Sequence, residues 1–283
     1  MASLKEVKGR IASVNNTRKI TSAMKMVASA KLHKAQAAIE SMLPYERRLH
    51  HILTDFMSNC TEVTSPFIVK REVKKVAVVV FASNTSLCGG FNANVIRHLV
   101  DLLAEYKPLG LENILVFPVG KKVADAVRKL GFRIEGDFQH MADKPSYQEA
   151  ADLAADLMKR FLHGDVDKVE LLYNHFKSTA SQILTRETYL PIDLNNEKKE
   201  EERTIDYILE PSAEELMQEM LPKVLRMKMF TVLLDSNAAE HAARTMAMQI
   251  ATDNANELLQ ELTVMYNKSR QQSITNELLD IVG

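Results

Sequence analysis

Apolar residues recur near both ends of the chain at alternating steps of three and four positions. The steps run through Ala28, Leu32, Ala35, Ile39 and Met42 at one end, and through Ala251, Ala255, Leu258, Leu262 and Met265 at the other. This spacing predicts two helices that pair along an apolar seam, as in a left-handed coiled coil. The alternative is two amphipathic helices of an ordinary bundle.

Gly and Pro, the residues that interrupt helices, are missing from both ends. Neither occurs in residues 10–43 or 223–282. The second run could form a helix of roughly 90 Å at 1.5 Å per residue. Because that exceeds the width of a compact domain of this size, the helix must project from the body or be sheathed by a partner. The seam steps beyond Met265 reach Ser269 and Gln272, so the tip is expected to meet a second partner.

The middle of the chain changes to short apolar strands that alternate with amphipathic helices. Strands are predicted at 75–83, 112–120, 132–138, 168–176, 181–192 and 204–212. Helices are predicted after Gly90, over 121–131, and over 146–164, where Ser146 is the expected N-cap. This order predicts a mostly parallel sheet with helices on both faces. The strand 181–192 alternates polar and apolar residues and is expected near an edge, and 195–203 is expected to be a charged loop.

These patterns predict an α/β protein in which one domain is inserted into another element. The N- and C-terminal segments form a long antiparallel two-helix coiled coil, and a three-layer Rossmann-like α/β domain lies between them. The expected boundaries are 1–60, 74–210 and 211–283. The two helices must be antiparallel because the chain leaves the pair and returns at the same place. The longer C-terminal helix should therefore overhang.

Charge is distributed unevenly along the 283-residue chain. The formal net charge is −1, but residues 1–38 carry eight Lys and Arg side chains against Glu6 alone. A helix this cationic is expected to face water or an acidic partner. A nucleic-acid or anionic-lipid binder using residues 5–34 is the main rival interpretation. The near-neutral total and the lack of interleaved aromatic residues argue against it, and no nucleic-acid partner is expected.

Motifs for catalysis, cofactors and metals are not found in the sequence. Gly89 and Gly90 follow the first strand, but the GxGxxG spacing and the Lys-Ser/Thr of a phosphate-binding loop are missing, so a tight, closely packed turn is expected. Cys88 is expected to be buried and structural, and the two cysteines favour a reducing compartment. No apolar run approaches the ~20 residues that span a bilayer. A transit peptide is not expected, because the helical pattern starts at Ser3.

Three stretches carry a resemblance to a known family. "IASVNNTRKITSAMKMVASAKLHKAQ" (11–36) resembles the N-terminal helix of the gamma subunit of F-type ATP synthases. "RTMAMQIATDNANELLQELTVMYNKSRQQSITNELLDIVG" (244–283) resembles its C-terminal helix, and "LCGGFN" (87–92) its central-domain turn. The resemblance spans essentially the whole chain.

The resemblance implies a central shaft of a rotary motor, itself not catalytic and without a cofactor or metal. Such a shaft turns inside a ring of three alpha and three beta subunits, and its foot rests on the epsilon subunit and the membrane ring of c subunits. The resemblance places Tyr207 and Glu210 in the foot segment that meets the c ring. It implies a peripheral membrane protein on the cytoplasmic face of the bacterial inner membrane, with the mitochondrial inner membrane as the alternative. Membrane association is expected through the c ring only.

The resemblance also assigns contacts inside the ring. Met24 and Lys25 are expected to face acidic loops of the beta subunits. Arg244 is expected near Met24, because the two helices are antiparallel. Arg270 and Gln271, further towards the tip, match family positions that contact the inner surface of the ring.

Overall fold

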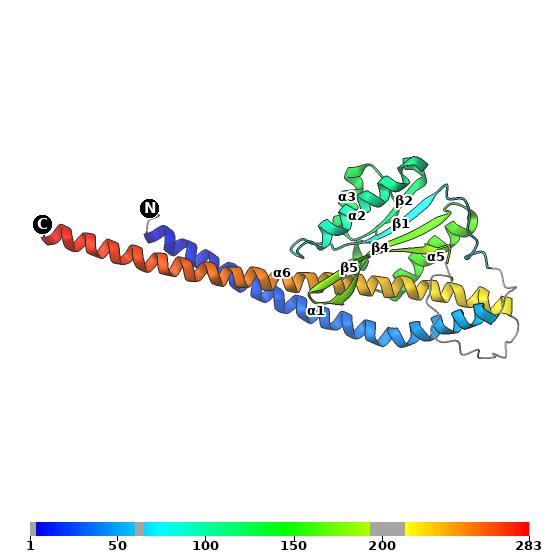
Figure 1. Cartoon of the computed structure of the whole chain (residues 1–283), viewed down its shortest axis with the longest axis horizontal. Helices are drawn as coiled ribbons and strands as arrows, with labels where there is room; N and C mark the ends of the chain where they lie inside the picture. Colours follow the sequence, from blue (N-terminus) through cyan, green and yellow to red (C-terminus); the bar gives the residue numbers. More distant parts are fainter. Residues whose placement is uncertain (1–3, 60–64, 193–212, 283) are drawn as a thin grey trace.

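Two long helices dominate the computed structural model, which describes residues 4–59, 65–192 and 213–282. The first, α1, spans Leu4–Asn59, and the last, α6, spans Ala213–Val282. They run side by side in opposite directions, and the sheet and its other helices lie along the part of α6 that comes first in the sequence (Figure 1). No helix in the described ranges is both long enough and apolar enough to cross a membrane.

Both helices continue through an internal proline. Pro44 lies inside α1, and Pro222 lies inside α6. A proline in a helix removes one backbone hydrogen bond and favours a kink, but packing of the flanking turns can outweigh this cost. Leu221 and Leu225, on either side of Pro222, are buried in the main core.

The sheet has five strands in the order β3-β2-β1-β4-β5. Their bounds are Val76–Phe81 (β1), Ile114–Val119 (β2), Arg133–Ile134 (β3), Lys168–Ser178 (β4) and Ser181–Leu190 (β5). The first four run parallel, and β5 pairs antiparallel with β4 at the edge. The predicted strands at these places and the edge position of β5 are confirmed. The predicted strand 204–212 and the predicted loop 195–203 lie outside the described residues.

Helices cover both faces of the sheet, because successive strand residues point to opposite sides. On one face, Val76, Val78 and Val80 of β1 pack against α2 (Phe91–Tyr106) and α3 (Lys121–Leu130). On the other face, the intervening residues of β1 pack against α5 (Tyr147–His163) and the first half of α6. Ser146 precedes α5 with an extended backbone, as expected for an N-cap, but its side chain makes no capping hydrogen bond. The short elements α4 (Gln139–Asp143), η1 (Lys107–Leu109) and η2 (Leu111–Asn113) were not predicted.

Two side-chain contacts fix the register of the helix pair. The hydroxyls of Thr21 and Thr252 lie 2.8 Å apart, and Arg18 donates to the amide oxygen of Asn256 at 3.3 Å. Each residue further along α1 therefore faces one residue earlier on α6. The seam predicted on α1 is confirmed, since Ala28, Leu32 and Ala35 are buried.

The seam predicted on α6 is half wrong. Ala255 and Leu262 are buried, but Leu258 is 38% exposed and Met265 is 49% exposed. Thr252 and Leu259 take the intervening positions instead, and both are partly buried. The predicted stripe and the observed stripe both contain Ala255 and Leu262. Between these two residues the predicted stripe contains Leu258, whereas the observed stripe contains Leu259. The pairing of Thr252 with α1 selects the second stripe.

The predicted overhang is present. Leu4, where α1 begins, lies level with Ser269, so residues 270–282 of α6 extend beyond the start of α1 (Figure 1). At 1.5 Å per residue this free end is about 20 Å long. Ser269 is partly buried and Gln272 is exposed, so the polar end of the seam coincides with the end of the pair.

Gly120, between β2 and α3, offers a test of the packing at the strand ends. Its φ is +114°, and an added Cβ would lie 2.1 Å from the carbonyl oxygen of Ala82. We expect Gly120→Ala to lower the free energy of unfolding by about 2–3 kcal/mol, because the clash is with backbone. Gly9→Ala is the control, since a Cβ there meets nothing within 4 Å and should stabilise α1 by about 0.5–1 kcal/mol. Urea unfolding measures both, and equal effects would contradict the prediction.

Candidate functional site

Arg244 joins the helix pair to the sheet. Its guanidinium donates to the Glu240 carboxylate at 2.7 Å, to the Thr85 hydroxyl at 2.9 Å and to the Ser86 carbonyl. Only 12% of its side chain is exposed. Glu240 precedes Arg244 by one helical turn, so both side chains project from the same face of α6. The cation therefore holds the turn after β1 against the helix.

Glu240 and His241 are buried at this joint with opposite consequences for charge. Burial raises the pKa of Glu240, although the hydrogen bond from Arg244 and the nearby Lys31 favour its charged form. Burial, Lys31 and Arg244 lower the pKa of His241 to about 4. Among the described residues, the buried Nδ1 atom of His241 has no hydrogen-bond partner. The joint therefore holds a carboxylate that needs its cation, beside an imidazole that stays neutral at neutral pH.

A network of small polar side chains holds the turn after β1 in place. Asn92 accepts a hydrogen bond from the Ser83 backbone N–H at 3.1 Å and donates to the Ser83 hydroxyl at 2.8 Å. Gly89 has a φ of +59°, and an added Cβ there would lie 3.8 Å from the Cβ of Ala247. The predicted tight, closely packed turn is confirmed. Cys88 is also buried as predicted, at 2% exposure.

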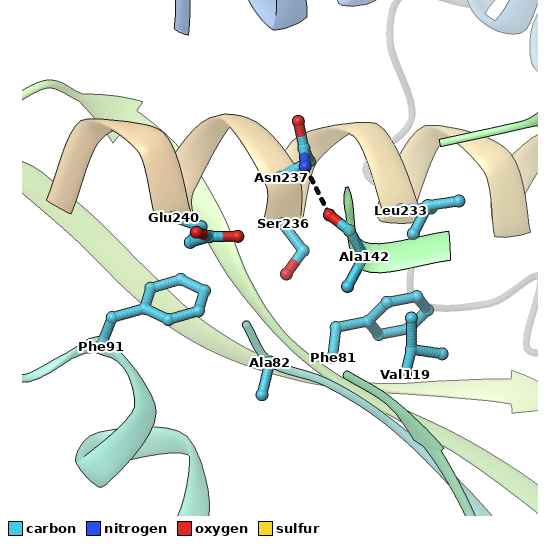
Figure 2. A pocket seen from close by; sticks show the side chains of 9 residues that line it. All are labelled: Phe81, Ala82, Phe91, Val119, Ala142, Leu233, Ser236, Asn237 and Glu240. Carbon is cyan, nitrogen blue, oxygen red and sulfur yellow. Dashed lines mark hydrogen bonds between the residues drawn. The ribbon is translucent and has the colours of Figure 1, made fainter. Parts of the chain in front are cut away.

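The space at the carboxyl ends of β1 and β2, where nucleotides bind in many parallel sheets, is filled by α6. Figure 2 shows Ser236, Asn237 and Glu240 of α6 above the ends of these strands, and Asn237 donates to the carbonyl of Ala142 at 2.8 Å. The small cavity there has a volume of about 10 Å³. A small-molecule site needs roughly 300–1,000 Å³. This edge therefore has no room for a nucleotide in the described part of the chain.

The structure gives the offset along the rod between two residues that were expected close together. The register puts Met24 level with Gln249, and puts Arg244 level with Ser29, about five residues further along α1. Met24 and Lys25 are partly buried. The side chain of Arg244 turns towards Thr85 and Ser86, which lie on the sheet side of the rod.

The remaining predicted residues lie elsewhere. Arg270 and Gln271 are exposed at the start of the free end of α6. Tyr207 and Glu210 lie outside the described residues. The predicted contact residues therefore do not form one cluster, and those described are spread along the rod.

Comparison with known proteins places the chain by sequence. The family model for ATP synthase matches residues 3–283. A protein named ATP synthase gamma chain from Phocaeicola vulgatus is 82% identical, with 100% of this chain and 99% of the relative covered. A protein of the same name from Bacteroides thetaiotaomicron is 63% identical, again with 100% and 99% covered. The chain belongs to the ATP synthase gamma-chain family.

Solved structures agree with this family at the level of the fold. The chain superposes on a chain of the Euglena gracilis mitochondrial ATP synthase with a TM-score of 0.62 at 21% identity, covering 99% of this chain and 92% of that one. A chain from the central stalk and c-ring structure of the Tetrahymena thermophila mitochondrial enzyme gives a TM-score of 0.56 at 22% identity, with 82% and 99% covered. The fold, with helical terminal segments around a mostly parallel central sheet, is thus shared with chains of these ATP synthase structures.

Sequence reasoning missed several residues of this gamma chain that the structure makes prominent. Glu240 and His241 were not singled out, although an acid four positions before Arg244 is a recognisable helical ion-pair signal. Apolar residues away from the seam were also missed. Those exposed along the paired region and the free end include Ile20, Val27, Ile250, Val264 and Ile281.

His241 should make stability depend on pH. The folded protein keeps this imidazole neutral down to about pH 4, whereas the unfolded chain binds a proton near the ordinary pKa of 6.5. This stabilisation is complete above pH 6.5 and is lost as the pH falls towards 4, by at most about 3 kcal/mol. We expect His241→Gln to flatten this part of the profile in thermal unfolding. The exposed His98→Gln control should leave it unchanged, and equal profiles for both variants would refute the assignment.

Arg244→Gln should destabilise the gamma chain by about 3 kcal/mol, because it leaves the buried Glu240 without its cation. Glu240→Gln in the same chain should recover part of this loss, so a double-mutant cycle by urea unfolding should give a positive coupling energy. Arg270→Gln, at an exposed position, is the control and should change stability by less than about 0.5 kcal/mol. Additive effects of Arg244→Gln and Glu240→Gln on the free energy of unfolding would contradict a stabilising interaction between these two side chains.

Proposed function

We propose that this chain is the central rotor of a bacterial F-type ATP synthase. It couples rotation of the c ring to sequential conformational changes in the catalytic beta subunits, in the direction of ATP synthesis or hydrolysis, and is not catalytic itself. The observation that carries the proposal is the match to ATP synthase gamma chains over the whole length of the chain. We further propose peripheral attachment at the cytoplasmic face of the inner membrane, through the c ring only.

We propose the domain organisation that the sequence predicted. Residues 1–60 and 211–283 form a coiled-coil shaft, and residues 74–210 form a Rossmann-like domain that connects the shaft to the foot. The continuous packing of α1 against α6 from Leu4 to Leu32 supports a shaft. The burial of the first turns of α6 in the core of the sheet supports a rigid connection, because turning the sheet must turn the helix.

The asymmetry of the shaft supplies a physical basis for its effect on neighbours. A ligand or partner shifts a conformational equilibrium only if it contacts the states differently. The paired region presents two helices, whereas residues 270–282 present one helix about 20 Å long. A ring of subunits around such an object meets a different surface at each angle, so each beta subunit can be held in a different state.

We propose partner contacts along this shaft. Met24 and Lys25 face acidic loops of the beta subunits, and eight basic side chains in residues 1–38 favour an acidic neighbour. Arg270 and Gln271 contact the inner surface of the ring, where their exposure leaves the Arg fork free for carboxylates. Arg244 also takes part in the contact with the ring, from its place where α6 meets the sheet.

We propose that the foot meets two further partners. Tyr207 and Glu210 contact the c ring, and the epsilon subunit binds beside them. The alpha and beta subunits are present in three copies each around a single copy of this chain.

Two rival functions receive less support. A nucleic-acid or anionic-lipid binder would use the basic first helix. Exposed apolar residues beside the basic ones, such as Ile20 and Val27, fit a protein partner better than a nucleic acid. An enzyme on the sheet would need a ligand site at the strand ends, where α6 leaves a cavity of about 10 Å³.

Assembly with alpha and beta subunits tests the proposed function. We expect native mass spectrometry to find one copy of this chain with three of each, and ATP hydrolysis that depends on adding it. Arg270→Glu should weaken assembly or slow hydrolysis, because it puts a carboxylate where the proposal needs a cation. Lys129→Glu, on an exposed turn of α3, is the matched control and should behave as wild type. Failure of the wild-type chain to join the ring, with salt-dependent binding to DNA or liposomes, would overturn the proposal.

A further inference from the structure

The hairpin of β4 and β5 continues past the sheet and reaches the helix pair. β4 pairs with β1 only as far as Leu172 within the described strands, whereas its pairing with β5 continues to Ser178. Residues 175–183, which follow the buried Tyr173 and Asn174, form a two-stranded arm beyond the pairing with β1. Figure 1 shows this hairpin lying across α6 where α6 runs beside α1.

Asp235 of α6 holds the arm with both carboxylate oxygens. The backbone N–H of Phe176 donates to Oδ1 at 2.8 Å, and Nδ1 of His175 lies 2.7 Å from Oδ2. The side chain of Asp235 is 15% exposed, so these bonds are partly shielded from water. A hydrogen bond to a charged acceptor is stronger than one between neutral groups. Asp235 was singled out by no motif in the sequence.

Phe176 packs into the place where three elements meet. Its ring contacts a cluster formed by Leu32 and Ala35 of α1 with Ala238 and Ala242 of α6. The same ring also contacts a second cluster, formed by Cys88 and Phe91 with two more alanines of α6, Ala239 and Ala243. Alanine side chains on α6 leave the room that an aromatic ring needs at this junction. The arm thus packs where α1 and α6 meet and beside the turn that Arg244 holds.

We propose that this arm is a torsional brace, which fixes the angle between the α/β body and both helices of the shaft. The proposal rests on the proposed rotor function and adds positioning roles for Asp235 and Phe176. The body is already joined to α6 through the first turns of that helix, so without the arm only the packing of α1 on α6 would resist a twist of α1 relative to the body. Phe176 packs against the cluster in which Leu32 and Ala35 of α1 meet α6, and this packing opposes that twist. A stiffer junction transmits more of the applied torque for a given rotation.

The brace makes a local prediction that hydrogen exchange can measure. In Asp235→Ala, in the full chain assembled with alpha and beta subunits, the hairpin amides should exchange roughly tenfold faster than in wild type, because a charge-assisted anchor is lost. Asp253→Ala is the matched control, since Asp253 is an exposed acid of α6 whose described partner, Gln249, lies on the same helix. That variant should leave exchange in the hairpin unchanged.

The same variants make a mechanical prediction. A bead attached through Lys129→Cys, in a Cys60→Ser background, reports rotation of the body while nucleotide holds the ring fixed. Asp235→Ala and Phe176→Ala should show larger angular fluctuations than wild type, with unchanged stoichiometry. Phe176→Leu, which keeps most of the apolar contact, should lie between Phe176→Ala and wild type. It also provides a test if the alanine variants fail to fold.

Wild-type fluctuations in Phe176→Ala, in a chain that assembles normally and whose hairpin exchanges faster, would overturn the brace and leave a purely local packing role. Unchanged hairpin exchange in Asp235→Ala would overturn the anchoring role of this carboxylate. Neither result would touch the rotor function, which fails only if the wild-type chain does not assemble with the ring.

Discussion

The burial of α6 against two different partners constrains the rest of the molecule. Its first turns complete the core of the sheet, where Met217, Leu221, Leu225 and Leu233 are almost fully buried. Its later turns pair with α1 and then run free. Because one continuous helix makes all these contacts, the direction of the rod is set by how its first turns pack on the sheet. The overhang follows from the register of the pair, which puts Leu4 at the start of α1 level with Ser269.

The joint between rod and sheet combines apolar packing with polar and ionic bonds. Arg244 and Asp235 each project from α6 and each hold a segment of the body by bonds to its backbone. Removing one partner of a buried charged pair is costly, while an apolar contact tolerates small shifts. Polar bonds therefore suit a joint at which the relative orientation of α6 and the sheet matters more than the strength of their packing. His241 lies buried beside them and is held neutral, so the fold loses stability at low pH.

An asymmetric rod with a rigid base also explains why membership of the gamma-chain family fits this architecture. Nothing in the described part of the chain provides a ligand-sized cavity at the strand ends, and the strand ends serve instead as the seat for α6. The sheet acts as a platform, and the residues proposed to meet partners are placed along the rod and at its base. The β4–β5 arm would make the two helices and the platform turn as one body.

The sequence by itself determined the helices at both ends, the positions of the five described strands, the edge place of the last one, and the family, because periodicity and motifs are properties of the chain alone. It could not determine which stripe of α6 is buried. The stripes through Leu258 and through Leu259 share Ala255 and Leu262, and only the approach of Thr21 to Thr252 separates them. Tertiary packing also carried the helices through Pro44 and Pro222, where local propensity predicts a break. The partners of Arg244 were likewise decided in three dimensions, because Thr85 and Ser86 lie more than 150 positions away in the sequence and meet α6 only after the sheet has formed.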